Sequence, residues 1–333
     1  MWKSEEHVLS GHLLKLIVQR ILLGIVTLFV ISMLIFLGTE FLPGDVAQTI
    51  LGQAATPENL AALRAELGLD RPPLTRYVEW LGGILQGDLG TSLSGRRDIA
   101  EMIGSRLGNT MYLAAVSAIV SIPLAILLGL IAVRFRDTWI DKFISITTLT
   151  TISLPEFFVA YILILVFSVK MMFWNPSLML PSLSNVYDGM TFGARLQAIA
   201  LPCITLTLVV LAYMMRMTRA AIINIMSSPY IEMAQLKGVN PFKILYRHAM
   251  PNAVSPIINV IVLNLAYLVV GVVVVEVIFV YPGLGQLLVD HVSKRDLPVV
   301  QAVGLIFAAV YISLNMLADI VSIIGNPKLR YPK

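Results

Sequence analysis

Six long apolar runs dominate the sequence and limit what it can fold into. They are Ile21–Thr39, Leu107–Val133, Phe143–Val169, Leu196–Met215, His248–Val275 and Leu297–Ala318. Glu156 is the single Lys, Arg, Asp or Glu within these runs. A helix needs about 20 apolar residues to cross the hydrocarbon core of a bilayer, whereas a membrane β-barrel shows alternating segments of about ten. The runs therefore predict an all-α membrane protein with six transmembrane helices.

We place the membrane helices at residues 21–39, 107–133, 143–169, 196–215, 256–280 and 299–324. The first run is longer than the apolar core of a secretory signal peptide, and residues 40–45 contain no small-residue cleavage pattern. We therefore expect it to remain in the protein as a helix. The other segments are short ends at 1–20 and 325–333, a long helical loop at 40–106, and loops at 216–253 and 281–298.

The Lys and Arg residues outside the runs indicate the orientation. With six crossings both termini lie on one side, and that side holds 14 of the 24 Lys and Arg residues. Six of the other ten lie in the long 40–106 loop, where charge has least influence on orientation. The positive-inside rule therefore predicts cytoplasmic termini, a cytoplasmic 216–253 loop, and external loops at 40–106 and 281–298.

Several other functions lack the residues they require. The net charge of +4 comes from basic residues that flank the runs, and they form no continuous stripe for nucleic acid. Cys203 is the single cysteine, so neither an intrachain disulfide nor a cysteine metal cage can form. The sequence has no Gly-rich phosphate loop, metal-ligand spacing or Ser/His/Asp arrangement in a suitable context. We expect no catalytic, metal or cofactor site in this chain.

The 40–106 loop has the pattern of short helices between turns. Thr56 and Pro57 begin a helix that Gly68 ends, and Leu74, Tyr77, Leu81 and Ile84 share one face of a second helix. The pattern predicts a segment packed onto the membrane domain. It leaves open whether the segment is a structural cap or a docking surface for an external protein.

The 216–253 loop contains a well-defined helix–turn–helix pattern. Ser228 is a candidate N-cap for a helix that begins at Pro229, Glu232 complements the positive end of that helix, and Gly238 permits a left-handed stop. Asn240 and Pro241 repeat the cap-then-proline signal, and we expect the second short helix to end before Pro251. A loop needs no such definition merely to connect two crossings. The pattern therefore predicts a rigid lever that presents one helix to a cytoplasmic partner.

These residues resemble the permeases of ABC importers, which carry a cytoplasmic Glu-Ala-Ala, Gly and Leu-Pro pattern at this place. Here the pattern reads Glu232-Met233-Ala234, then Gly238, then His248-Ala249-Met250-Pro251, with Met233, His248 and Met250 departing from it. Further segments over nearly the whole chain resemble the dipeptide, oligopeptide and nickel branch of this family. They are Leu42–Asp45, Glu66–Asp70, Gly87–Gly90, Arg216–Arg219, Glu276–Phe279, Pro282–Gly285 and Arg295–Gln301.

The resemblance implies a type I importer permease in the bacterial inner membrane. Its partners would be a second, similar permease, an external substrate-binding protein, and two ATPase subunits that hold ATP and Mg²⁺. The helix at residues 229–237 would be the coupling helix on one ATPase. The residues assigned to coupling are Ser228, Pro229, Tyr230, Glu232, Ala234, Lys237, Gly238, His248 and Pro251.

The substrate stays open at this level. Di- and oligopeptides are the leading class implied by the resemblance, with nickel, glutathione, or an oligosaccharide or opine as further possibilities. A stand-alone secondary transporter or channel would show inverted repeats and several mid-membrane charges, and an intramembrane enzyme would show a paired catalytic motif. The sequence shows none of these features.

A few polar residues within or next to the runs are candidates for specific roles. Glu156 follows Pro155, and we expect it to line the translocation path or to pack against Arg134 or Arg136. Asn264 and Asn315 are weaker path candidates, because polar residues in crossings more often bond neighbouring helices. Glu276 is expected to bond backbone amides of the turn at residues 281–283, and the group assigned to this structural turn is Glu276, Pro282, Gly283 and Gly285.

Overall fold

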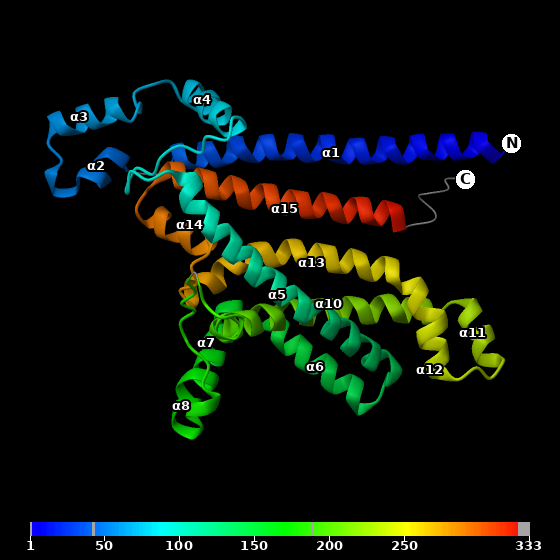
Figure 1. Ribbon diagram of the computed structural model, residues 1–333. Coiled ribbons are helices and arrows are strands. Elements are labelled where there is room, and N and C mark those ends of the chain that lie inside the picture. The colour runs from blue at the N-terminus through cyan, green and yellow to red at the C-terminus, as the bar shows by residue number, and fades with distance from the viewer. Residues whose placement is uncertain (1, 42–43, 188, 326–333) are drawn as a thin grey trace.

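The computed structural model describes residues 2–41, 44–187 and 189–325, and these residues form a bundle of helices (Figure 1). Leu42 and Pro43 of the first family segment lie outside the described residues, as does the predicted tail beyond Gly325. In the described part, extended pairing is limited to one isolated bridge between Thr91 and Asp98. The protein is therefore all-α, as its apolar runs predict.

The helices follow one another along the chain with short connections. The longer ones are α1 (Trp2–Glu40), α5 (Ile99–Arg134), α6 (Trp139–Ser153), α10 (Ala200–Met226), α13 (Met250–Ile278) and α15 (Leu297–Gly325). The shorter ones are α2 (Val46–Leu51), α3 (Pro57–Glu66), α4 (Pro73–Leu85), α7 (Glu156–Leu163), α8 (Met171–Trp174), α9 (Phe192–Ala198), α11 (Pro229–Leu236), α12 (Pro241–Lys243) and α14 (Leu284–Ser293). Two π-helical segments, Ile164–Lys170 and Ile244–Ala249, continue α7 and α12.

The predicted number of membrane helices is confirmed. Within the described residues, six helical segments are long and apolar enough to cross a bilayer. They are Lys15–Glu40, Ile99–Arg134, Glu156–Trp174, Ala200–Met226, Pro241–Ile278 and Leu297–Val321. Several begin earlier or end later than the apolar runs, because the helical backbone continues into the polar flanks.

The third crossing predicted at residues 143–169 is divided in the structure, because the chain breaks at Pro155. The helix ends at Ser153, Leu154 is extended with φ −89° and ψ 134°, and a new helix begins at Glu156. Pro155 has no N–H to donate, and its ring disfavours a helical residue before it, so the two halves separate at this point. The candidate crossing is the second half, from Glu156 to Trp174, and α6 forms a separate helix beside α5 and α10.

Helix α10 packs between α5 and α13 and forms the centre of the bundle. Its buried residues Leu206, Val210 and Met214 contact the same apolar core as Leu113 of α5 and Val272 of α13. Helix α1 packs against α15 at the edge, and its outer side chains stay uncovered, with Leu22, Ile25 and Val26 each more than half exposed. Such an apolar outer surface is suited to contact with lipid.

The two ends of the bundle differ in what they carry (Figure 1). The start of α1, the α5–α6 turn, and α11 with α12 lie together at one end. Helices α2 to α4, α8 and α14 lie at the other. The helix–turn–helix pattern and the long 40–106 loop are therefore separated by the full length of the membrane helices.

The segment from α2 to α4 forms the predicted short helices and is tied to α1. Thr56 caps α3 by accepting a hydrogen bond from the Asn59 amide at 3.2 Å, as its position predicts. Tyr77 of α4 is 6% exposed, and its hydroxyl lies 2.9 Å from Ser32 Oγ. Its ring packs edge-on against Phe36, with 5.4 Å between the ring centroids. These contacts confirm that α4 packs onto the membrane domain at Tyr77, whereas Leu74 of the predicted face is 71% exposed.

Asp296 anchors the loop before α5 to the start of α15. It is 1% exposed and accepts hydrogen bonds from the Leu93 amide (3.0 Å), the Ser94 amide (3.1 Å) and the hydroxyls of Ser92 and Ser94. Burial alone would raise the pKa of this carboxyl, but the hydrogen bonds outweigh burial and hold the pKa below its usual value. The charged form is therefore the one that the fold stabilises.

We expect Asp296→Asn to destabilise the protein by about 2 kcal/mol at pH 7, because the amide cannot accept all of these hydrogen bonds. Since the folded pKa lies below the unfolded one, the stabilisation is complete above the ordinary aspartate value of about 4 and is lost as the pH falls through the lowered value. Thermal unfolding in detergent measures the effect. The gap in Tm between wild type and variant should narrow at pH 3, and an equal gap at pH 3 and pH 7 would contradict this account.

Candidate functional site

The helix–turn–helix pattern folds into an elbow, which we define as residues 228–250. Gly238 has φ +71° and provides the predicted left-handed stop after α11. Asn240 caps the next helix, since its side chain accepts a hydrogen bond from the Phe242 amide at 2.9 Å. Figure 1 shows α11 folded back beside α12. The caps that the sequence predicts at Gly238 and Asn240 are therefore present.

The predicted side-chain cap at Ser228 is wrong. Ser228 occupies the N-cap position of α11 with an extended backbone (φ −82°, ψ 148°), but its side chain caps no amide. Its hydroxyl instead donates to the carbonyl oxygen of Ile225, in the last turn of α10. Ser228 therefore ties α11 to the preceding helix.

The expected end of the second short helix before Pro251 is also wrong. The helical backbone runs from Pro241 to Ile278 without a break, and the segment Ile244–Ala249 is π-helical. Pro251 has no N–H to donate, and the wider π-helical turns before it allow the helix to continue despite the missing hydrogen bond. The second half of the elbow, residues 241–250, is consequently part of the same helix as the fifth crossing.

One side of the elbow is buried and the other is exposed. Ile231 of α11 packs with Ile244, Leu245 and Ala249, and all four are at most 6% exposed. The outer side presents apolar and aromatic side chains to solvent. They are Tyr230 (46% exposed), Met233 (54%), Leu236 (76%), Phe242 (65%) and Tyr246 (71%). The rings of Phe242 and Tyr246 are stacked, with 6.5 Å between their centroids.

The other residues assigned to coupling lie around this exposed side. Glu232 and Lys237 are exposed on α11, and neither forms an ion pair with a described residue. Ala234 is half-buried against the apolar cluster beneath. The carbonyl oxygen of His248 accepts hydrogen bonds from Tyr230 (3.4 Å) and Asn252 (2.8 Å). His248 therefore helps to hold α11 against the longer helix.

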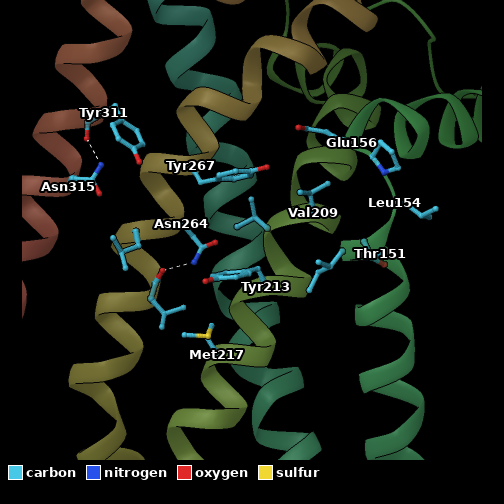
Figure 2. Close-up of a pocket in the computed structure, with 15 residues that line it drawn as sticks. Thr151, Leu154, Glu156, Val209, Tyr213, Met217, Asn264, Tyr267, Tyr311 and Asn315 are labelled. Atoms are coloured by element: carbon cyan, nitrogen blue, oxygen red, sulfur yellow. Dashed lines mark hydrogen bonds between the residues drawn. The ribbon is translucent and has the colours of Figure 1, made fainter. Parts of the chain in front are cut away.

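A cavity of about 560 Å³ lies in the middle of the bundle, and it brings all three path candidates together. Figure 2 shows Glu156 at the start of α7, Asn264 on α13 and Asn315 on α15 around it. Asn264 and Asn315 each donate through the side-chain amide to the carbonyl four residues earlier, at 2.7 and 2.9 Å. Their amide oxygens keep their capacity to accept hydrogen bonds.

Aromatic side chains of this cavity were not among the predicted path residues. Tyr213, Tyr267 and Tyr311 also line it, as does Met217. Tyr267 follows Asn264 by three residues and Tyr311 precedes Asn315 by four, so helical spacing places each tyrosine on the same face as an asparagine. That spacing is the signal that could have identified them. Tyr213 lies on α10, where no candidate asparagine stands at helical spacing from it.

The turn after α13 is held by Glu276, which is fully buried. Its carboxylate accepts hydrogen bonds from Thr110 Oγ1 (2.6 Å) and from the amides of Gly285 (2.7 Å) and Gln286 (3.3 Å). The backbone amides that it bonds therefore lie just beyond the predicted 281–283 turn. The carbonyl oxygen of Pro282 accepts a hydrogen bond from Asn109 at 2.9 Å. These bonds fix the turn to α5.

Gly283 and Gly285 leave the space that Glu276 occupies. A Cβ atom at Gly283 would overlap the Glu276 carboxylate. At Gly285 it would lie 2.6 Å from the Cα atom of Val273. Both glycines are therefore required for close approach of the chain to α13.

Comparison with known proteins identifies the family. Residues 121–331 match the binding-protein-dependent transport system inner membrane component, and residues 13–114 match the N-terminal membrane component of such systems. The chain belongs to this family. It is a permease subunit of a binding-protein-dependent ABC importer and a multi-pass protein of the bacterial inner membrane. The family is one of transport permeases that work with a binding protein, rather than of stand-alone transporters or catalytic subunits.

Curated relatives match the permease over almost its whole length. A putative peptide transport system permease protein of Brucella abortus (strain 2308) is 34% identical over 316 residues, which cover 95% of this chain and 99% of the relative. The glutathione transport system permease protein GsiC of Escherichia coli (strain K12) is 35% identical over 320 residues, which cover 96% of this chain and 100% of the relative.

In this permease we expect Gly285→Ala to lower stability by about 1–3 kcal/mol, because the new methyl group would press against the backbone of α13. Gly104→Ala is a matched control, since Gly104 lies in α5 with nothing within 4 Å of its added Cβ. Alanine at that helical position should raise stability by about 0.5–1 kcal/mol. Thermal unfolding in detergent compares the two variants. Equal stability of both variants would show that the Glu276 turn does not need Gly285.

Proposed function

We propose that this permease forms the translocation path of a peptide importer. It would pair with a second, similar permease, with two ATPase subunits and with an external substrate-binding protein. The relatives support a peptide substrate, since several are named peptide transport permeases and others are named glutathione permeases. Glutathione is itself a small peptide and is the second candidate substrate. Nickel, or an oligosaccharide or opine, has no support from the names of these relatives.

The exposed side of the elbow is the observation that carries the coupling role. An exposed apolar surface with aromatic residues is typical of a contact with another protein. We propose that α11 faces the cytoplasm and docks on one ATPase subunit, as the distribution of basic residues also supports. ATP and Mg²⁺ would be bound by the ATPase subunits, and this chain would bind no cofactor. The segment from α2 to α4 would then lie outside, where it caps the bundle or receives the binding protein.

The unbroken helix from Pro241 to Ile278 gives a physical route from motor to path. Its first turns pack against α11, and its middle carries Asn264 and Tyr267 at the cavity. A movement of the docked elbow would therefore shift one wall of the cavity as a rigid body. The cavity volume lies within the range of about 300–1,000 Å³ that is usual for small-molecule sites. Glu156, Asn264 and Asn315 would line the half of the path that this chain provides.

We expect Gly238→Val to abolish uptake while the complex still inserts in the membrane. A β-branched residue at φ +71° is strained, so the stop of α11 and the seating of the docked helix would change. Gly87→Val is the matched control, since Gly87 has φ +85° and open space around it at the other end of the bundle. Uptake in proteoliposomes and co-purification of the ATPase measure the effect. Normal coupling in Gly238→Val would refute the role of α11.

We also expect Glu232→Lys to abolish coupling, because it reverses a charge on the docking helix without altering its buried side. Glu58→Lys changes an exposed first-turn acid of α3 at the opposite end and serves as its control. ATP hydrolysis by the assembled importer, with and without loaded binding protein, is the measurement. Stimulated hydrolysis should be lost in Glu232→Lys, and the ATPase should remain bound in Glu58→Lys. The proposal fails if Glu232→Lys keeps both the stimulation and the uptake.

A further inference from the structure

Glu156 is an acid in the membrane region for which the described residues provide no hydrogen bond to Oε1 and no ion pair. Its Oε1 atom is buried. The second role expected for it, packing against Arg134 or Arg136, is not observed, since Arg134 lies over the Phe135 ring and Arg136 faces Asp137. The carboxylate instead points into the bundle (Figure 2).

The surroundings hold this carboxylate at the cavity wall. Glu156 begins α7 directly after Pro155, so the positive end of that helix lies beside its negative charge. Gly271 of α13 lies opposite, and a Cβ atom there would make an ordinary contact of 3.5 Å with Glu156 Oε1. Figure 2 shows the side chains of Glu156 and Tyr267 directed toward one another across this part of the cavity. The position is built for an acid that faces the path.

The described lining of the cavity carries hydroxyl groups, amide groups and the Glu156 carboxylate, but no cation. No Lys, Arg or His is among the residues that form it. Asn264 and Asn315 contribute free amide oxygens, because their amide nitrogens donate to the carbonyls of Val260 and Tyr311. Acceptor oxygens around a carboxylate create a negative potential, which attracts positive charge and repels negative charge.

An ionisable side chain at membrane depth is expensive unless something neutralises it. Because the described lining of the cavity supplies no cation, a positive charge that pairs with this carboxylate would come from the substrate or from another subunit. A zwitterionic peptide brings equal charges of both signs, so its net effect on the carboxylate is small. A basic side chain adds an uncompensated ammonium or guanidinium group, which is the complementary partner.

We propose that Glu156 is a specificity-determining residue of the path, where it binds the basic side chain of a cationic peptide during transport. This inference rests on the proposed peptide function and adds the class of peptide. The contact between carboxylate and cation lowers the cost of moving a positive charge through the low-dielectric interior. Cationic peptides are therefore taken up faster than neutral peptides of the same size.

The test uses the complete importer in proteoliposomes with its own binding protein. Two tripeptides, Ala-Lys-Ala and Ala-norleucine-Ala, differ in one ammonium group and are close in length and apolar area. Uptake is expressed per molecule of loaded binding protein, so that selection outside the membrane is removed from the comparison. The variants are Glu156→Gln, the conservative Glu156→Asp and the uncharged control Thr151→Val, which changes another residue of the same cavity.

We expect Glu156→Gln to reduce the preference for the lysine peptide by about tenfold, the size of one charge-assisted contact, with little change for the norleucine peptide. Glu156→Asp should keep much of the preference and Thr151→Val all of it. The wild-type importer should itself take up the lysine peptide faster than the norleucine peptide, and this comparison needs no variant.

Three results would overturn the inference. If Glu156→Gln slowed both peptides equally, Glu156 would have a structural role or would pair with a cation of the second permease. An unchanged preference would show that a neutral group suffices at this position. Both results leave the proposed peptide function intact. Uptake of neither peptide by the wild-type importer would instead remove the peptide function and this inference with it.

Discussion

The hydrocarbon core of the bilayer offers no hydrogen-bond partners, so every backbone amide and carbonyl in it has to be paired within a helix or buried in protein. This constraint favours a crossing that stays helical past Pro256, and the same helix extends back through Pro251 to Pro241 in the elbow. That helix carries the elbow at one end, a wall of the cavity in its middle and Glu276 at the other end. The elements with assigned or proposed roles are therefore linked by one stiff body.

Two departures from regular α-helix lie at elements with proposed roles, whereas the π-helical segment Ile164–Lys170 has no role assigned. The π-helical segment Ile244–Ala249 lies inside the elbow, and the break at Leu154 and Pro155 places Glu156 at the cavity. At the far end, the buried Glu276 carboxylate accepts hydrogen bonds from the backbone amides of Gly285 and Gln286. This polar group is covered by the surrounding protein, whereas Pro155 and Tyr246, at the two irregular places, are exposed.

Local signals in the sequence predicted local structure well. The long apolar runs gave the number of crossings, and Thr56, Gly238 and Asn240 predicted helix ends because each acts on amides or dihedral angles a few residues away. The predicted side-chain cap at Ser228 was wrong because the hydroxyl donates to a competing acceptor in the preceding helix. The sequence did not predict that the helix continues through Pro251. The π-helical turns before Pro251 bury Ile244, Leu245 and Ala249 against α11 and α10, and a local pattern does not show such packing. The cavity forms only where α10, α13 and α15 pack together from distant parts of the chain. The sequence therefore predicted individual polar residues of the path, but not the cavity that they line.

The central claim is that α11 faces the cytoplasm and is covered by an ATPase subunit. The single cysteine, Cys203, is buried, so Met233→Cys introduces one exposed thiol on the outer side of α11. Labelling this thiol with a membrane-impermeant reagent tests orientation and docking in one measurement. We expect no labelling in intact cells, strong labelling in inside-out vesicles stripped of the ATPase, and protection when the ATPase is restored. Labelling from outside the cell, or an absence of protection by the ATPase, would contradict the account.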